Sequence, residues 1–258
     1  MTHPVSNEGE AMSRPLSGKV VVVAGGGRGI GAATALKLAA AGARVVVVAR
    51  TGSELEAVAA RIAAQGGQAG THVADVTQSA DVETLANELQ STYGQVDILV
   101  NSAGVALIAP LDDTSETDWD LVIDTNLKGP YLCIRAMLGL LRASDGAHVV
   151  NVASKVGLTG HELVAAYTAA KAGLIGLGRS LAQELAADNI RVTTLCPGPV
   201  DTPMRWAATP DMDPRFALPA DTVAETIFFL VTLDGQVTTN EIVVEAIGYD
   251  EGAVSLRD

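Results

Sequence analysis

The feature that most constrains the fold is an alternation of short apolar runs with amphipathic stretches along nearly the whole chain. The runs are unbroken and rich in Val, Ile and Leu, which is typical of strands buried on both faces of a sheet. They cover Val20–Ala24, Arg44–Ala49, a stretch ending at Ala74, Val96–Val100, His148–Ala153, Arg191–Leu195 and a region near Glu241–Ala246. The alternation therefore predicts one α/β domain, a doubly wound parallel sheet of about seven strands with helices on both faces.

The stretches between these runs have the periodicity of helices. They cover Ala32–Ala41, Ser53–Gln65, Ala80–Thr92, Ser115–Leu141 with Ser115 as N-cap, Leu163–Ala187 and Ala220–Thr232. Only Thr202–Pro219 is predicted to be a long irregular loop inside the domain, and such loops often close over a substrate. We expect a disordered N-terminal tail over 1–16, with Met12 as a possible natural start, the domain over 17–250, and a C-terminal tail over 251–258.

Composition argues against several classes of function. The net charge is −13 among 258 residues, whereas phosphate backbones and anionic membranes bind basic patches. No apolar run reaches the roughly 20 residues of a membrane span, and the polar, acidic N-terminus has no secretion signal. Two cysteines form neither a disulfide framework nor a four-ligand zinc site. We therefore expect a cytoplasmic protein with a small-molecule substrate, no metal, and no nucleic-acid or membrane partner.

A glycine-rich loop follows the first predicted strand and leads directly into a helix. Its residues are Gly25, Gly26, Gly27, Arg28, Gly29, Ile30 and Gly31. Glycines allow a tight turn and let a pyrophosphate approach the N–H groups of the helix start, where the helix dipole is positive. A glycine-rich turn can also simply join a strand to a helix. Its place after the first strand favours dinucleotide binding.

The end of the second predicted strand indicates which dinucleotide binds. An acidic residue there would accept a hydrogen bond from the ribose 2′-hydroxyl, but this chain has Arg50 followed by Thr51. Together with Arg28, Arg50 would hold a 2′-phosphate, which favours NADP(H) over NAD(H). The alternative is that Arg50 is only a solvated charge.

Two further strand ends lie at the same predicted edge. Asp75 and Val76 follow the third strand, where the carboxylate could accept a hydrogen bond from the adenine amino group. Asn101, Ser102, Ala103 and Gly104 follow the fourth, where small residues let the backbone pass close to a ligand. Taken alone, both are ordinary turns.

Tyr167 and Lys171 are four residues apart on a predicted helix and so share a face. A nearby ammonium favours the phenolate and lowers the pKa of a phenol, which makes it a better acid–base group. Ser154 stands at the end of the fifth strand and Asn126 on the preceding long helix. An exposed tyrosine on an amphipathic helix is the alternative interpretation.

Taken together, these motifs resemble the short-chain dehydrogenase/reductase family from Lys19 to about Gly248. The glycine loop is similar to the family's T-G-x-x-x-G-x-G, with Ala24 in place of the threonine. The segment from Asn101 to Gly104 is similar to N-N-A-G, with Ser102 substituted. The family's catalytic tetrad falls on Asn126, Ser154, Tyr167 and Lys171, and its proline–glycine segment for the nicotinamide amide falls on Pro197, Gly198, Val200 and Thr202. The last strand lacks the frequent aspartate–glycine–glycine ending.

The resemblance implies a Rossmann-type fold and an oxidoreductase. Tyr167 would exchange a proton with the substrate oxygen, Ser154 would stabilise that oxygen, and Lys171 would bind the nicotinamide ribose. Asn126 would hold a water in a proton relay. The resemblance also implies a homodimer or homotetramer that packs through the long helices.

The substrate is expected to be a ketone or secondary alcohol of small or medium size. Predicted wall residues of its pocket are Val105, Val156, Leu158, His161 and Met204, whereas Arg205 and Arg215 are expected to be solvated. Similarity to 3-oxoacyl-(acyl-carrier-protein) reductases makes 3-oxoacyl thioesters a named candidate. The alternatives are an NAD-dependent alcohol dehydrogenase and a non-catalytic NADP sensor or scaffold.

Overall fold

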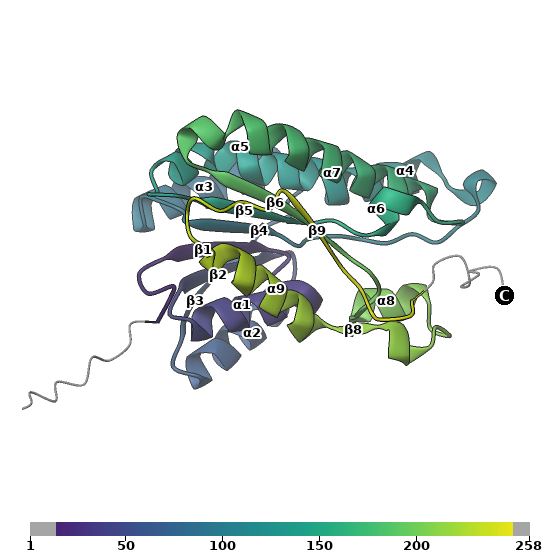
Figure 1. The fold of residues 1–258 in the computed structure, drawn as a ribbon, viewed down its shortest axis with the longest axis horizontal. Helices are drawn as coiled ribbons and strands as arrows, with labels where there is room; N and C mark the ends of the chain where they lie inside the picture. Colours follow the sequence, from purple (N-terminus) through teal and green to yellow (C-terminus); the bar gives the residue numbers. More distant parts are fainter. Residues whose placement is uncertain (1–13, 250–258) are drawn as a thin grey trace, which may run out of the picture.

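Seven parallel strands form the central sheet of the structure, a computed structural model that describes residues 14–249 (Figure 1). Their order is β3-β2-β1-β4-β5-β6-β9, and every neighbouring pair is parallel. The strands are β1 (Val20–Ala24), β2 (Arg44–Ala49), β3 (Gln68–Val73), β4 (Ile98–Asn101), β5 (His148–Val152), β6 (Arg191–Pro197) and β9 (Glu241–Val244). The predicted doubly wound parallel sheet is confirmed.

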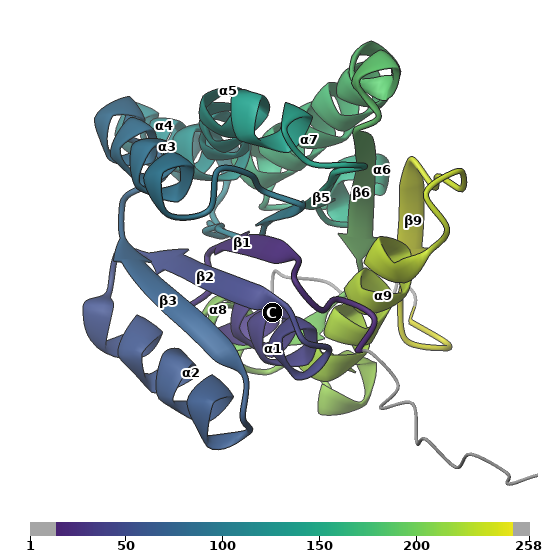
Figure 2. The ribbon, with the colours of Figure 1, turned by 90° about the vertical axis from the view of Figure 1, so that its left-hand side faces the viewer.

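Helices cover both faces of this sheet (Figures 1 and 2). One face carries α1 (Gly29–Ala40), α2 (Gly52–Ala64) and α9 (Ala220–Thr232); the other carries α3 (Ser79–Thr92), α5 (Gly129–Arg142) and α7 (Ala165–Glu184). The side chains of successive valines in β1 pack alternately against the helices on one face and on the other. Val21 and Val23 pack with α1, α2 and α9, whereas Val22 packs with α3 and α5. Because both sets of side chains are buried, the central strands are apolar at most positions.

The long helix predicted over Ser115–Leu141 is not continuous in its hydrogen bonding. It consists of α4 (Glu116–Ile123), a π-helical segment (Asp124–Lys128) and α5. Ser115 caps α4 as predicted, because its hydroxyl accepts a hydrogen bond from the Asp118 N–H at 3.1 Å. π-helical turns widen a helix locally and often mark functional positions.

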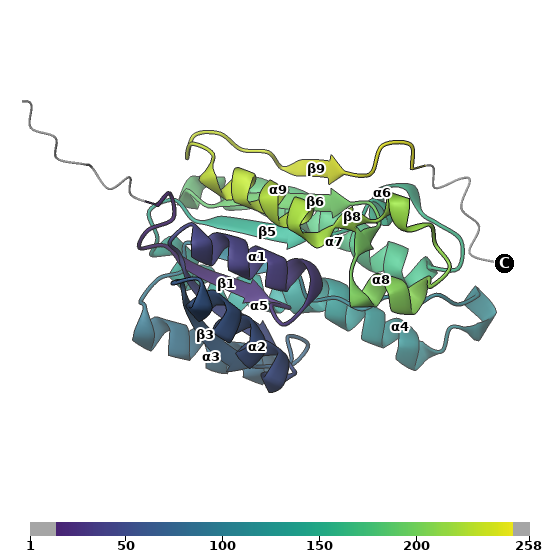
Figure 3. The same cartoon turned by 90° about the horizontal axis from the view of Figure 1, so that it is seen from below.

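The segment 202–219 is more regular than the predicted irregular loop. It contains α8 (Pro203–Ala208) and a 3₁₀ turn (Pro214–Phe216). The short strands β7 (Val200–Asp201) and β8 (Leu218–Pro219) pair in parallel and hold its two ends together. The strand arrows in Figure 3 point toward α8, so this segment lies at the carboxyl edge of the sheet with the short helix α6 (Val156–Thr159).

The predicted tails fall mostly outside the described residues, over 1–13 and 250–258. Within the described part, the N-terminal boundary at 16 is too late. Leu16 is buried in the core beside α1, and its N–H donates a hydrogen bond to the Ala41 carbonyl at 3.0 Å. Between residues 14 and 249, no helix is long and apolar enough to cross a membrane.

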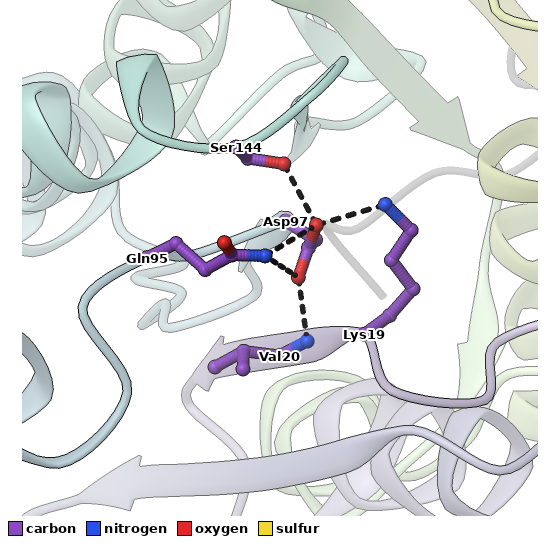
Figure 4. A network of polar contacts seen from close by, with 5 residues as sticks. All are labelled: Lys19, Val20, Gln95, Asp97 and Ser144. Carbon is purple, nitrogen blue, oxygen red and sulfur yellow. Dashed lines mark hydrogen bonds and ion pairs between the residues drawn. The ribbon is translucent and has the colours of Figure 1, made fainter.

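A buried carboxylate stabilises the amino edge of the sheet (Figure 4). Asp97, which is 2% exposed, accepts hydrogen bonds from the Val20 N–H at 2.8 Å, the Ser144 hydroxyl at 2.7 Å and the Lys19 ammonium at 2.9 Å. Gln95 Nε2 donates to both carboxylate oxygens. Burial alone would raise the pKa of Asp97, but these donors outweigh burial and lower it.

We expect Asp97→Asn to reduce the free energy of unfolding at neutral pH by about 2 kcal/mol, because the amide loses charge-assisted hydrogen bonds. Since the folded pKa of Asp97 is lowered, its stabilisation is present above the unfolded value of about 3.9 and is lost as pH falls through the folded value. Urea unfolding across acidic pH measures both effects.

The matched control is Asp188→Asn, which removes a surface carboxylate paired with Arg142 at 2.8 Å. Exposed ion pairs contribute about 0–1 kcal/mol, so this variant should stay close to the unmodified chain. Equal losses for the two variants would contradict the role of Asp97.

Candidate active site

Two adjoining cavities open at the carboxyl edge of the sheet. The first, here the glycine-loop cavity, lies between the β1–α1 turn and the ends of β2 and β3. The second, the tyrosine cavity, lies between the end of β5, α7 and α8. They share a common border formed by Ile30, Ser102, Gly104, Thr202 and Met204. One extended ligand can therefore occupy both.

The glycine loop is shaped by close backbone approaches. Gly25 has φ +81°, and a Cβ there would lie 2.4 Å from the Ala103 nitrogen. A Cβ on Gly31 would lie 2.1 Å from the Gly25 carbonyl oxygen, so neither position accepts a side chain without backbone movement. The Gly25 and Gly26 N–H groups donate to the Val48 carbonyl at 2.8 and 3.0 Å. This anchor from β2 holds a loop whose preceding residue, Ala24, has no hydroxyl.

Charged side chains lie around the far end of the glycine-loop cavity. Arg28, Arg50, Asp75 and Glu54 all line it. Arg50 Nη1 lies 3.8 Å from Asp75 Oδ2, and the side chain of Arg50 is 60% exposed. Asp75 also accepts hydrogen bonds from the N–H and hydroxyl of Thr77. Glu54 was not predicted, because only the packing of α2 beside Gly27 brings it to the cavity.

Asn101 lies beneath the cavities and lines neither of them. It is 2% exposed, and its Nδ2 donates to Asn151 Oδ1 on the neighbouring strand β5 at 2.9 Å. Its predicted contact with a cofactor stays a prediction. The amide joins β4 to β5 below the catalytic residues.

Tyr167, Lys171 and Ser154 meet in the tyrosine cavity. The ammonium of Lys171 lies 5.6 Å from the centroid of the Tyr167 ring, so the two side chains share one face of α7. Lys171 Nζ donates a hydrogen bond to the Val152 carbonyl at the end of β5 at 2.8 Å. The side chains of Ser154 and Tyr167 are hydrogen-bonded to each other.

Burial controls the protonation of this group. It lowers the pKa of Lys171 to about 8. Burial also raises the pKa of Tyr167, while the hydrogen bond to Ser154 and the positive charge of Arg205 oppose that rise. The expectation that Lys171 lowers the pKa of Tyr167 is therefore wrong, because burial outweighs the groups that oppose it. Lysine is already neutral at the pH where such a buried phenol ionises.

Asn126 lies in the π-helical segment and faces the same cavity. Its Nδ2 donates to the Val105 and Val122 carbonyls at 2.8 and 2.9 Å, which fixes the orientation of the amide. Among the described residues nothing donates to its buried Oδ1. A Cβ on Gly104 would lie 2.8 Å from this oxygen and 3.8 Å from Lys171 Nζ. A side chain at position 104 would therefore crowd the Asn126 amide oxygen beside Lys171.

The structure brings nearly all the predicted site residues to the two cavities. The tyrosine cavity is lined by Asn126, Ser154, Tyr167, Lys171, Pro197, Gly198, Val200 and Thr202, and the glycine-loop cavity by Gly25, Arg28, Gly29, Ile30, Arg50, Thr51, Asp75, Val76, Ala103 and Gly104. Gly31 lies behind the loop against Gly25. Among residues 14–249, no three His, Cys, Asp or Glu side chains cluster to hold a metal.

The predicted pocket wall is partly confirmed. Val156, His161 and Met204 line the tyrosine cavity. Leu158 is 40% exposed and Val105 packs against the core beside Val122, so neither contributes to the lining. Sequence reasoning missed Ala106, Ile108, Val164, Ala208 and Tyr249, which carry no chemical signal and reach the cavity only through folding.

The fold and the paired cavities define a dinucleotide-binding α/β protein, and comparison with known proteins gives its family. The family model described as short chain dehydrogenase matches residues 19–213. A 3-oxoacyl-(acyl-carrier-protein) reductase from Synechocystis is 38% identical over 224 residues, which cover 84% of this chain and 90% of that protein. D-threitol dehydrogenase from Mycolicibacterium smegmatis is 34% identical over 91% of this chain and 94% of its own.

A solved structure supports the same assignment. The crystal structure of a metagenomic short-chain oxidoreductase in complex with NADP superposes with a TM-score of 0.79 at 37% identity, covering 89% of this chain and 97% of that one. The chain belongs to the short-chain dehydrogenase family and is an oxidoreductase of that family.

Proposed function

We propose that this chain is an NADP(H)-dependent oxidoreductase that moves a hydride between nicotinamide and a carbonyl or secondary alcohol, with Tyr167 as general acid and base. The observation that carries the proposal is the position of Tyr167 and Lys171 in a cavity continuous with the glycine-loop cavity. An acid–base pair beside a dinucleotide site is what carbonyl reduction requires.

The residues present fit a dinucleotide. Gly25 and Gly31 let the loop pack tightly, because a Cβ on either would meet backbone within 2.4 Å. Gly29 lines the cavity at the start of α1, where a pyrophosphate would meet N–H groups. Asp75 and Val76 would contact the adenine, and Thr51 the adenosine ribose. Pro197, Gly198, Val200 and Thr202 would hold the nicotinamide amide at the border of the tyrosine cavity.

Each side chain of the tyrosine cavity has a distinct task in the reduction. When bound at the border of the two cavities, the reduced nicotinamide would supply the hydride for the carbonyl carbon. The Tyr167 hydroxyl donates its proton to the carbonyl oxygen, and the Ser154 hydroxyl donates a hydrogen bond to the same oxygen as its negative charge develops. The carbonyl thus gains one hydride and one proton and becomes an alcohol. In the reverse direction Tyr167 accepts the proton.

Lys171 and Asn126 return a proton to Tyr167. With its pKa near 8, Lys171 is charged at neutral pH and exchanges protons readily. Its ammonium would donate to the nicotinamide ribose, while Asn126 Oδ1 would hold a water between Lys171 and solvent. The buried, unpaired state of Asn126 Oδ1 among the described residues supports this assignment.

Two arginines favour NADP(H) over NAD(H). Arg28 and Arg50 line the region where the adenosine ribose would lie, and a guanidinium binds a phosphate as a fork. The NADP in the complex of the similar metagenomic oxidoreductase supports the same choice. The Asp75 carboxylate lies 3.8 Å from the Arg50 guanidinium.

The cavity is compatible with several substrate classes. The similar reductase from Synechocystis is named for a 3-oxoacyl carrier-protein substrate, and the one from M. smegmatis for a sugar alcohol. A 3-oxoacyl thioester reductase and an NAD-dependent alcohol dehydrogenase are therefore alternative activities. The preserved pairing of Tyr167 with Lys171 argues against a non-catalytic sensor. The homodimeric or homotetrameric assembly and the cytoplasmic location remain predictions.

We expect Tyr167→Phe to lower kcat for NADPH-dependent carbonyl reduction by at least about 100-fold, the usual contribution of a general acid. Binding of NADPH should change little, because the phenol acts on the substrate oxygen. Steady-state kinetics over a panel of ketones, with NADPH titration by fluorescence, measures the two properties separately.

Tyr131→Phe is the matched control, since Tyr131 lies on α5 with 44% exposure and away from both cavities. It should retain full turnover. Turnover of Tyr167→Phe within a few-fold of the unmodified chain would refute the acid–base role.

We expect Arg50→Ala to lower kcat/KM for NADPH about tenfold, because one charge-assisted contact to the 2′-phosphate is lost, and to leave NADH nearly unchanged. Arg44→Ala is the control, because Arg44 is exposed at the opposite end of the same strand. The measurement is kcat/KM with NADPH and with NADH for each variant. An unmodified chain that uses NADH as efficiently as NADPH would contradict the predicted preference.

A further inference from the structure

Arg205 is placed in the tyrosine cavity by the start of α8. Thr202 caps this helix, since its hydroxyl accepts a hydrogen bond from the Arg205 N–H at 3.3 Å. The Arg205 side chain is half-buried and lines the tyrosine cavity together with Tyr167. The expectation of a solvated arginine is therefore wrong for Arg205, whereas Arg215 is 83% exposed and paired with Asp213.

The neighbours that hold Arg205 are a thioether and a phenol. Its Nη2 contacts the Met212 sulfur, and its side chain is hydrogen-bonded to Tyr249. Among residues 14–249 no carboxylate forms an ion pair with it, and its Nε is buried without a hydrogen-bond acceptor there. Burying a guanidinium without an opposite charge is unfavourable unless a ligand supplies that charge.

The charge of the tyrosine cavity is opposite to that of the whole chain. The chain has a net charge of −13. Nevertheless, the described lining contains Lys155, His161, Lys171 and Arg205 but no Asp or Glu. Lys155 is paired with Glu245, and Lys171 donates to the Val152 carbonyl at 2.8 Å. Since the proposed function assigns the Lys171 ammonium to the nicotinamide ribose, Arg205 is a lining cation whose charge is left for the substrate.

We propose, on the basis of the proposed function, that Arg205 binds a carboxylate group of the substrate and that the chain reduces oxo acids or oxidises the corresponding hydroxy acids. The carbonyl would lie against Tyr167 and Ser154, and the carboxylate against Arg205. Between them the lining is largely apolar, with Ile108, Val156 and Val164 around a short carbon chain.

A carboxylate fits this position better than a phosphate. The guanidinium presents two parallel N–H groups that match the two carboxylate oxygens. A phosphate dianion ordinarily needs several donors or a helix N-terminus, and the described lining near Arg205 offers a single guanidinium. The reaction consumes one hydride from NADPH and one proton per carbonyl and leaves the carboxylate unchanged.

The test compares straight-chain oxo acids, with increasing numbers of methylene groups between carbonyl and carboxylate, with their methyl esters and a 3-oxoacyl thioester. NADPH consumption gives kcat/KM for each substrate. For the best-fitting chain length we expect the acid to exceed its ester by about tenfold or more, which corresponds to one charge-assisted contact. The difference should appear chiefly in KM, since Arg205 binds away from the reacting oxygen.

Arg205→Met removes the charge while keeping an unbranched side chain, and it should bring the acid-to-ester ratio close to one. Arg205→Lys should recover part of the preference. Arg215→Met is the control, because it removes a charge from the same segment but outside the cavity. It should leave the acid-to-ester ratio unchanged. Thermal unfolding and NADPH titration of Arg205→Met show that the fold and dinucleotide site are intact.

Three outcomes overturn the inference. The first is equal use of acids and esters by the unmodified chain, and the second is an equal loss for both in Arg205→Met. The third is a clear preference for the thioester that does not depend on Arg205. Each leaves carbonyl reduction intact, whereas absence of NADPH consumption with every ketone, ester, thioester and acid refutes the proposed function itself.

Discussion

A buried ammonium is the constraint around which the candidate active site is arranged. Lys171 is 4% exposed, and its Nζ is held by the Val152 carbonyl at the point where β5 ends. A cation in this position needs nearby polar groups, and the protein provides Asn126 across Gly104 and Tyr167 one turn earlier on α7. The parallel sheet makes this convergence possible, because all its strands end at one edge. The opposite edge carries the Asp97 network, which stabilises the sheet and takes no part in the chemistry.

Those parts of the fold and site that depend on local sequence could be predicted. Unbroken valine runs identify central strands because both faces are buried, and β1 is buried at all its positions. The spacing of Tyr167 and Lys171 places both on one helix face, and the glycine loop must follow β1 for its N–H groups to meet a ligand. In each case the signal lies within a few neighbouring residues, so one sequence is sufficient.

The remaining features depend on contacts between distant segments. The π-helical segment at Asn126 interrupts an otherwise regular helical pattern, and no residue in 124–128 predicts this interruption. The link that Asn101 makes between β4 and β5 could not be predicted, because it depends on Asn151 of the neighbouring strand. The burial of Arg205 could not be predicted from the sequence, because it depends on the packing of α8 beside Tyr249. Desolvation is likewise invisible in sequence, although it determines the protonation of both Lys171 and Tyr167.

The central claim is that a buried, charged Lys171 beside Tyr167 sustains proton transfer to the substrate. The pH dependence of kcat/KM for NADPH tests it most directly, because this parameter follows ionisations of the free enzyme. Since the pKa of Lys171 is lowered to about 8, we predict a constant value at lower pH and a decline as pH rises through about 8. A profile that stays flat until the ordinary lysine value of about 10.4 would contradict the account.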